Sequence, residues 1–439
     1  MDIIGTFMLT AAEASAPVAP SASSQLHLIV AVSIFILSFG LILSEKYSRA
    51  IIAFLGGGLL VITGVLNEED VIHALDFETL GLLLGMMIIV AIMKDSGVFQ
   101  YAAIKAAKLA KAKPMGILAA FFFITAIFSA FLDNVTTVLL ITPVILLVVQ
   151  ELEVKPYAYL FSTILASNIG GATTLIGDPP NIMIGSAAGL SFNDFIINLS
   201  PVTILSGITT IAIILLIWRK DLKATERAQS RIMRLNEKET ITNKALAIQS
   251  IIVVAFVLLG FIFGHQLNLT PAAVAMFGAA VMLLLDNLDY PTHEQNERFH
   301  NKIGEAEWVT LFFFGGLFLL VYGLEKTGVI TQIANLMLKL TGGDFKALVL
   351  ITLWGSAIVS AIIDNIPFVA TMIPLIKDIG MNLNGSQDIE TLWWALSLGA
   401  CLGGNGSLVG ASANLVVAGI SERGGYSIKF IPFMLRAFP

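Results

Sequence analysis

Apolar segments of the length needed to cross a lipid bilayer recur along this 439-residue chain, and they constrain its fold more than any other feature. The clearest cover residues 26–43, 51–66, 202–218, 245–264 and 271–285. A spanning helix needs about 20 apolar residues, with about 17 as the short limit. Charged residues make up only 13% of the chain, against about a quarter in a soluble domain. We therefore predict an all-α polytopic membrane protein with about 10–11 spans.

The sequence gives no support for metal, nucleotide or disulfide chemistry. Cys401 is the single cysteine, which excludes an internal disulfide and a cysteine-based zinc site, and its apolar surroundings indicate a buried packing residue. The segment HEQNERFH at 293–300 is close to a zinc-protease motif, but Glu297 stands where the second histidine is needed. No intramembrane nucleophile–base pair points to an enzyme. We expect no metal, no cofactor and no nucleic-acid partner.

Lysine and arginine positions predict the orientation, because cytoplasmic loops carry an excess of them. Residues 218–244 hold eight and should form a cytoplasmic linker. The segments 94–114 and 45–49 are also basic, whereas 67–78 has no lysine or arginine. With an extracytoplasmic N-terminus, about 20 of the 25 basic residues fall inside. We expect a multi-pass protein of the inner (plasma) membrane.

The two halves of the chain repeat each other in inverted orientation. A shift of 231 residues places Ser129, Ala130, Asp133, Asn134, Val138 and Pro143 on identical residues that begin at Ser360. A shift of 233 does the same for glycines and an asparagine of 170–181 and 403–414. Counted from the linker, a first hairpin at 115–150 enters from the cytoplasm, and a second at about 347–378 enters from outside. Such inverted repeats build a central site that faces either side of a membrane in turn, as in transporters.

This path predicts four parts of the chain. Residues 1–25 are an extracytoplasmic tail or a signal-like segment, 26–218 a first transport repeat, 219–244 the basic linker and 245–439 a second, inverted transport repeat. The second half looks one element short, so we expect that a last helix is absent from this sequence.

Four polar interruptions of the apolar spans pair with each other through the repeat. The hairpin segments are SAFLDNVTT (129–137) and SAIIDNIPF (360–368). The other two segments, at 167–185 and 401–417, are dense in glycine, threonine, serine and asparagine, and the first contains Pro179-Pro180. Non-helical backbone at membrane depth is tolerated only where it faces protein or a wet cavity. We expect two broken spans whose free backbone groups bind a small polar solute or ion; glycines that only permit tight helix packing are the alternative.

Three carboxylates lie within these interruptions. Asp133 and Asp364 fall at the two hairpin tips, where desolvation disfavours the charged form of a carboxylate. They are candidate proton carriers unless a cation offsets their charge, and capping of a hairpin helix is the structural alternative. Asp178 has Ala411 as its repeat counterpart; as a residue before Pro179 it suits the N-cap of a half-helix, and we favour capping over ion binding there.

The chemistry-bearing positions are the polar residues and glycines of the four interruptions. The candidate substrate- or ion-binding residues are Asp133, Asn134, Thr136, Thr137, Asn168, Gly170, Gly171, Thr173, Thr174, Asp178, Asn181, Asp364, Asn365, Gly403, Gly404, Asn405, Ser407 and Asn414.

The segment SNIGGATTLIGDPPNIMIG, together with the paired Asp-Asn hairpin tips, resembles the ion transporter superfamily. The similarity covers nearly the whole chain and is closest to ArsB/NhaD-type permeases and the related P-protein, which have a citrate-transporter-like domain. The resemblance implies a scaffold domain and a transport domain, a site between the hairpin tips and the broken helices, an elevator-like motion and often a homodimer. Some arsenite permeases are also energised by a cytoplasmic ATPase subunit.

One departure from the superfamily bears on the substrate. Members that carry dicarboxylates have Ser-Asn-Thr at each tip, where this chain has Asp133-Asn134-Val135 and Asp364-Asn365-Ile366. A carboxylate in the site repels a dianion but suits a cation, or a neutral solute exchanged against protons. We expect proton-coupled efflux of arsenite or antimonite. A sodium/proton antiporter is the alternative; a dicarboxylate symporter or an ion channel fits less well.

Overall fold

The computed structural model describes residues 22–44, 46–382 and 389–439 of the chain. Within these ranges, eight helices are long and apolar enough to cross a bilayer, and three shorter apolar helices accompany them. No strand occurs in the part of the chain that is described. The prediction of an all-α polytopic membrane protein is therefore confirmed, while the N-terminal segment 1–21 lies outside the described residues.

The helices of the first repeat and of the linker are α1 (Ala22–Leu43), α2 (Arg49–Ile62), α3 (Glu68–Ala74), α4 (Phe77–Asp95), α5 (Val98–Leu109), α6 (Pro114–Phe131), α7 (Asn134–Leu152), α8 (Tyr157–Gly171), α9 (Pro179–Ala188), α10 (Phe192–Trp218), α11 (Glu226–Arg234) and the 3-10 helix η1 (Glu237–Thr240). The second repeat contains α12 (Lys244–Gly264), η2 (His265–Leu267), α13 (Pro271–Asn287), α14 (Thr292–Gly304), α15 (Trp308–Lys326), α16 (Val329–Thr341), α17 (Phe345–Ile362), α18 (Asn365–Asn382), α19 (Glu390–Gly403), η3 (Gly404–Gly406), α20 (Ser412–Arg423) and α21 (Phe430–Ala437).

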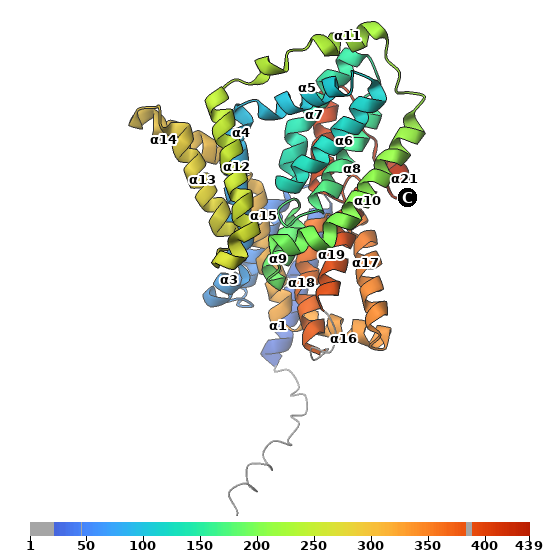
Figure 1. Ribbon diagram of the computed structural model, residues 1–439. Coiled ribbons are helices and arrows are strands. Elements are labelled where there is room, and N and C mark those ends of the chain that lie inside the picture. Colours follow the sequence, from blue (N-terminus) through green and yellow to red (C-terminus); the bar gives the residue numbers. More distant parts are fainter. Residues whose placement is uncertain (1–21, 45, 383–388) are drawn as a thin grey trace, which may run out of the picture.

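The helices pack in two groups, each built from both repeats. In the scaffold group, α1–α4 and α12–α15, the most extensive contacts are those of α2 with α15 and of α13 with α4. In the transport group, α5–α10 and α16–α20, α6 packs on α8 and α17 on α19, while α7 contacts α20 and α18 contacts α9. Figure 1 shows α12, α13 and α14 on one side and α6, α8, α10 and α17 on the other. Each contact is thus matched by the equivalent contact of the inverted repeat, so the two repeats interlock in the same way within each group.

Two helical hairpins point at each other from opposite ends of the transport group. The first, α6–α7, turns at Leu132 and Asp133, and the second, α17–α18, turns at Ile363 and Asp364. In Figure 1, α6 and α7 occupy the upper part of the molecule, and α17 and α18 the lower part. The inverted pair of hairpins inferred from the repeat is therefore present.

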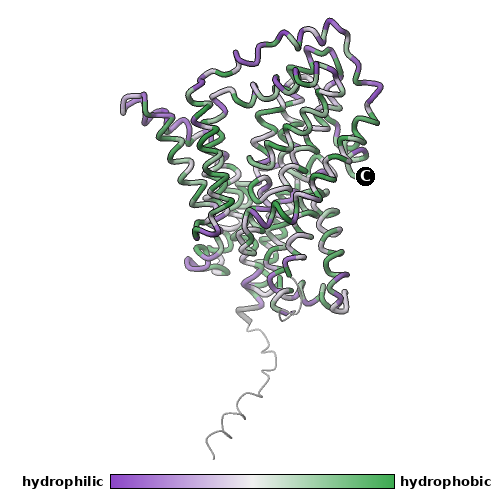
Figure 2. Tube along the Cα trace, viewed as in Figure 1, coloured by the Kyte–Doolittle hydropathy of each residue, from purple (hydrophilic) through white to green (hydrophobic). Residues whose placement is uncertain are grey.

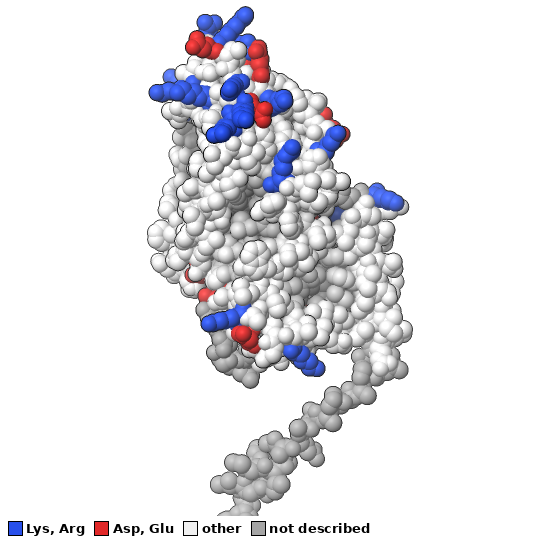
Figure 3. All heavy atoms as spheres, turned by 90° about the vertical axis from the view of Figure 1, so that its right-hand side faces the viewer, with Lys and Arg blue, Asp and Glu red and all other residues white. Residues whose placement is uncertain are grey.

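Charged and hydrophilic residues gather at the two ends of the helices. Figure 2 shows hydrophobic residues along the helices, with hydrophilic stretches at α3, α11 and the tip of α14. In Figure 3, lysines and arginines crowd the end of the molecule that carries α11, and few lie at the other end on that face. Helix α11 and η1 belong to the basic linker, and Lys108 of α5 pairs with Glu237 at 2.7 Å. The linker and the basic segment before α6 therefore lie at the same end.

Candidate functional site

Asp133 lies at the first hairpin tip, between the end of α6 at Phe131 and the start of α7 at Asn134. Its Oδ1 atom accepts a hydrogen bond from the backbone N–H of Thr136 at 2.8 Å, so Asp133 is the N-cap of α7. The residue is 8% exposed. Among the described residues, no basic side chain lies within ion-pair distance of it. A cap satisfies one of the free N–H groups at a helix start, and it leaves the other carboxylate oxygen available to a proton or an ion.

At the second tip, the aspartate also accepts from a backbone N–H of the helix that follows it, but it has a basic partner as well. The Oδ1 atom of Asp364 accepts from the backbone N–H of Ile366 at 3.1 Å. Its Oδ2 atom lies 2.7 Å from Nη1 of Arg49 and accepts from the hydroxyl of Ser412 at 2.7 Å. Arg49 also donates to that hydroxyl at 2.6 Å, which closes a triangle of three polar groups. Arg49 is the first residue of α2, so this ion pair joins the scaffold group to the transport group.

Both spans that follow the hairpins are broken, as the glycines and prolines predict. Helix α8 ends at Gly171 and α9 begins at Pro179; α19 ends at Gly403 and α20 begins at Ser412. The glycines also allow close packing: a Cβ at Gly170 would lie 2.2 Å from the carbonyl oxygen of Ala126, and one at Gly403 2.4 Å from that of Ala357. The structure therefore agrees with both interpretations of these glycines: they lie at helix breaks, and they allow these breaks to pack tightly against the hairpins.

The side chain of Asp178 does not cap α9, and our preference for capping was wrong. Pro179 and Pro180 carry no N–H, and the N–H of Asn181 donates to the backbone carbonyl of Asp178 at 2.9 Å. The carboxylate has no donor within reach on its own helix. It accepts instead from Nδ2 of Asn365, at 3.2 Å to Oδ2, and is 1% exposed. Asp178 thus joins the first broken span to the second hairpin tip.

Asparagine amides link the two repeats in the centre of the transport group. Asn168 donates to Oδ1 of Asn405 at 3.1 Å and to Oδ1 of Asn414 at 2.9 Å, and accepts from Nδ2 of Asn134 at 3.3 Å. Asn181 and Asn414 each donate to carbonyls of their own broken span. All five are buried. The amides thus satisfy backbone groups that the helix breaks leave free.

Some of the remaining predicted site residues contact a hairpin or their own broken span, and others face elsewhere. Thr174 donates to the carbonyl of Ala130 in the first hairpin, and Ser407 accepts from the N–H of Gly410 at 3.2 Å. Thr173 instead contacts Thr203 of α10, at 3.0 Å between the hydroxyls, so it faces away from the asparagines. The carbonyl oxygens of Gly171 and Gly404 accept from the asparagine of the same repeat. Thr136 lines a 120 Å³ cavity with Lys94, Glu305 and Glu307.

The comparisons with known proteins agree with this geometry. Residues 39–399 match the CitMHS family, described as a citrate transporter. The chain belongs to the CitMHS family. It is 40% identical over 409 residues to the 46 kDa membrane protein of Mycobacterium leprae, covering 92% of this chain and 93% of that protein. It is also 31% identical over 499 residues to the P protein of Mus musculus, covering 95% of this chain and 59% of the relative.

A solved structure shares the fold of this CitMHS member. The crystal structure of the Alcanivorax borkumensis YdaH transporter, described as having an unusual topology, superposes with a TM-score of 0.54. The alignment covers 92% of this chain and 91% of that one at 14% identity. The assignment to the ion transporter superfamily is therefore confirmed, and the chain is a multi-pass membrane transporter.

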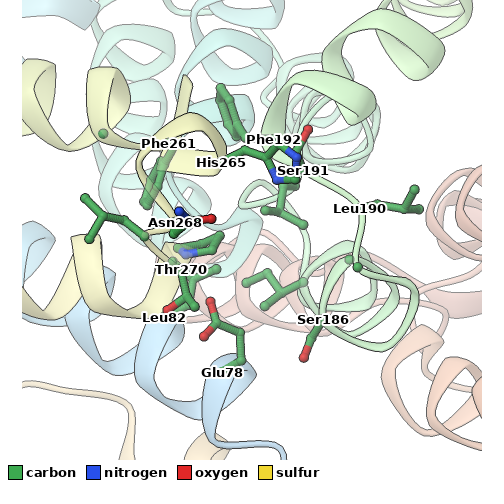
Figure 4. Close-up of a pocket in the computed structure, with 17 residues that line it drawn as sticks. Glu78, Leu82, Ser186, Leu190, Ser191, Phe192, Phe261, His265, Asn268 and Thr270 are labelled. Atoms are coloured by element: carbon green, nitrogen blue, oxygen red, sulfur yellow. The ribbon is translucent and has the colours of Figure 1, made fainter. Parts of the chain in front are cut away.

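Two interface cavities of this CitMHS member correspond through the repeat. One, of about 370 Å³, lies beside the second tip, where Arg49, Glu307, Thr310, Asp364 and Ser412 line it with apolar residues of α1. The other, of about 460 Å³, is shown in Figure 4, where Glu78 faces His265 and Thr270 of the α12–α13 turn. The turns α1–α2 and α12–α13 are equivalent in the two repeats. None of the predicted site residues lines the cavity in Figure 4.

Four residues that contact the site were not predicted to do so. Arg49 was assigned to a basic loop, because nothing local links it to Asp364, 315 positions away. Ser412 lies directly after the predicted Ala411, and its proximity to the repeat motif was the available signal. Ser397 donates to Oδ1 of Asn181 at 2.6 Å, and buried Cys401 to the same atom at 3.5 Å, so this cysteine contacts the site as well as filling space.

Proposed function

We propose that this CitMHS member is a proton-coupled secondary transporter that exports arsenite or antimonite by alternating access. The observation that carries the proposal is the charge of the site. Three carboxylates, of Asp133, Asp178 and Asp364, lie within it, and Arg49 is the single basic side chain that pairs with one of them among the described residues. A buried charge is retained only when it is paired or neutralised. Protons provide that neutralisation and can leave again on the other side.

The uncharged part of the site supports a neutral, hydroxyl-bearing solute. Asn134 Oδ1 and Thr137 Oγ1 are buried and have no hydrogen-bond partner within the described chain. Unpaired buried polar atoms cost about 1–3 kcal/mol each, so a ligand that pairs with them binds favourably. Arsenite is mostly a neutral trihydroxide at neutral pH, and its three hydroxyl groups can donate to such oxygens.

Sodium/proton antiport is the second candidate, and one arrangement favours it. Carboxylate and hydroxyl oxygens from both repeats lie close together at Asp178, Asp364 and Ser412, and Asn365 connects Asp178 to the second hairpin tip. Hard cations prefer oxygen ligands of this kind. Citrate, named in the family description, would enter a site with an excess of negative charge, so it is the weakest of the three candidates on these grounds.

Flux measurements in proteoliposomes test the proposal. Purified protein is reconstituted, and uptake of arsenite, sodium and citrate is followed separately, with and without an imposed pH gradient. We expect arsenite flux that the pH gradient accelerates and that protein-free vesicles lack. The exposed Asp289→Asn variant, which removes a carboxylate far from the site, is the matched control and should behave as the wild type. Sodium flux without arsenite flux would favour the antiporter, and citrate flux alone would overturn the proposal.

A further inference from the structure

The Arg49–Asp364 ion pair is the polar contact that ties the second hairpin tip to the scaffold group. Helix α2, which begins at Arg49, packs on α1 and α15 within the scaffold. The guanidinium carbon lies 5.0 Å from the ring centre of Phe313 on α15. From this base, one nitrogen reaches both Asp364 and Ser412 on transport helices. The side chain therefore bridges two bodies that must move relative to each other if the site is to face both sides.

Arg49 does not stabilise α2, the helix that it begins. A positive charge at a helix N-terminus meets the positive end of the helix dipole, which is unfavourable. Ser48, the N-cap, makes no side-chain capping bond. Both observations point to a role outside α2, and the contacts with Asp364 and Ser412 supply one.

The two tips differ in this respect although their sequences repeat. Asp133 has a backbone cap and no basic partner among the described residues, whereas Asp364 has Arg49. Other titratable groups near the pair are Glu307 before α15 and Tyr47 in the α1–α2 turn, which line the same cavity. Asp178 reaches Asp364 through Asn365, and Asp133 lies at the opposite tip. A proton or cation entering this cavity therefore meets Asp364 with one positive charge already in place.

We propose that Arg49 is a tethered cation that latches the second hairpin tip to the scaffold, and that a proton or cation arriving at Asp364 releases the latch. The proposal deepens the proposed function, since it assigns the residue that couples occupancy of the site to movement. In the latched state the carboxylate is charged and paired. Once the carboxylate is neutralised, Arg49 loses its partner and the transport group is free to move.

Hydrogen–deuterium exchange of the purified protein tests the latch without any substrate. Peptides that cover 46–50 and 409–414 report on its two sides. Protection is expressed relative to the intrinsic exchange rate at each pH. In the wild type, we expect strong protection at about pH 8 and weaker protection at about pH 4, where aspartate side chains ordinarily take up protons. Arg49→Gln and Asp364→Asn should exchange fast at both values, and the double variant no faster than either. Arg49→Lys, which keeps the charge, should retain most of the protection.

A matched control and a transport readout separate the latch from a structural role. Lys46→Gln removes a positive charge from the same turn, where Lys46 is exposed and has no ion pair among the described residues, so it should match the wild type. In proteoliposomes, the flux of Arg49→Gln should depend at least about threefold less on pH than that of the wild type, a difference of about 0.7 kcal/mol. Three results would overturn the latch: wild-type protection that does not change with pH, effects of Arg49→Gln and Asp364→Asn on exchange that add up in the double variant, or unchanged exchange in Arg49→Gln. Absence of arsenite flux with intact exchange behaviour would overturn the proposed substrate alone.

Discussion

Ser129 and Ser360 make the same hydrogen bond in the two inverted repeats. The hydroxyl of Ser129 donates to the carbonyl of Ser167 at 2.5 Å, and that of Ser360 to the carbonyl of Ala400 at 2.6 Å. Each bond ties the first helix of a hairpin to the broken span behind it. The repeat is therefore preserved in side-chain contacts as well as in helix order, although the two halves run in opposite directions.

Ser129→Ala and Ser360→Ala should destabilise the protein by similar amounts. Each removes a buried donor and leaves a buried carbonyl with one partner fewer, at a cost of about 1–2 kcal/mol. Thermal unfolding in detergent, followed by intrinsic fluorescence, measures the effect. Ser230→Ala on the exposed face of α11 is the control and should leave the midpoint unchanged. Strongly unequal losses would count against an equivalent role.

Gly170→Ala and Gly403→Ala should be far more damaging. The added Cβ would meet hairpin backbone at 2.2 Å and 2.4 Å, and backbone cannot rotate away as a side chain can. We expect losses above about 3 kcal/mol, beyond ordinary overpacking, seen as low yield of monodisperse protein and a lowered unfolding midpoint. Gly58→Ala in α2 has no atom within 4 Å of the new Cβ and should be neutral or slightly stabilising. Normal folding of both site variants would show that the hairpins can move away from the breaks.

Asn168→Ala should weaken the link between the repeats. Asn168 pairs with Asn134, Asn405 and Asn414, and its truncation leaves their buried amide atoms without partners. We expect a loss of about 2–3 kcal/mol in the free energy of unfolding. The flux per folded protein should fall as well, beyond what the loss of folded protein explains. The unfolding midpoint and proteoliposome flux are compared with those of Asn198→Ala, which alters an exposed asparagine on α10. Wild-type flux in Asn168→Ala would remove this residue from the site.

Two ion pairs outside the site occupy equivalent positions in the two repeats, with the acidic and the basic partner exchanged. Asp70 of α3 pairs with Lys326 at the end of α15, and Lys302 of α14 pairs with Asp95 at the end of α4 at 2.5 Å. The backbone N–H of Asn67, first, and then Lys326 hold the pKa of Asp70 below its usual value. A lowered folded pKa stabilises the protein above the unfolded pKa of about 3.9, and this contribution is lost as the pH falls through the folded value.

Asp70→Asn should therefore lower the unfolding midpoint at neutral pH, and the difference from the wild type should shrink below about pH 4. Unfolding midpoints measured across this range test the prediction. Glu69→Gln removes the same charge from the same helix turn, where Glu69 is exposed, and should show no such trend. A constant difference at all pH values would mean that the Asp70 contacts do not depend on its charge.

The sequence predicted the parts of the fold that depend on local or repeated patterns. Apolar runs, the Asp-Asn pairs and the Gly-Pro clusters predicted the spans, the two hairpins and the helix breaks. The N-cap rule failed at Asp178, because Pro180 has no N–H and the N–H of Asn181 donates to the backbone carbonyl of Asp178 instead of to its side chain. Arg49 escaped prediction because its pairing with Asp364 depends on how the scaffold and transport groups meet, which no local pattern encodes.

The most direct test of the account measures proton movement with Asp133→Asn. Asparagine is as good an N-cap as aspartate, so the start of α7 should be retained while the titratable group is lost. In proteoliposomes that contain a pH-sensitive dye, we expect wild-type arsenite flux to carry protons. In Asp133→Asn, both should fall by about tenfold or more, which corresponds to about 1.4 kcal/mol or more in the barrier. Wild-type arsenite and proton flux in this variant would contradict the central claim.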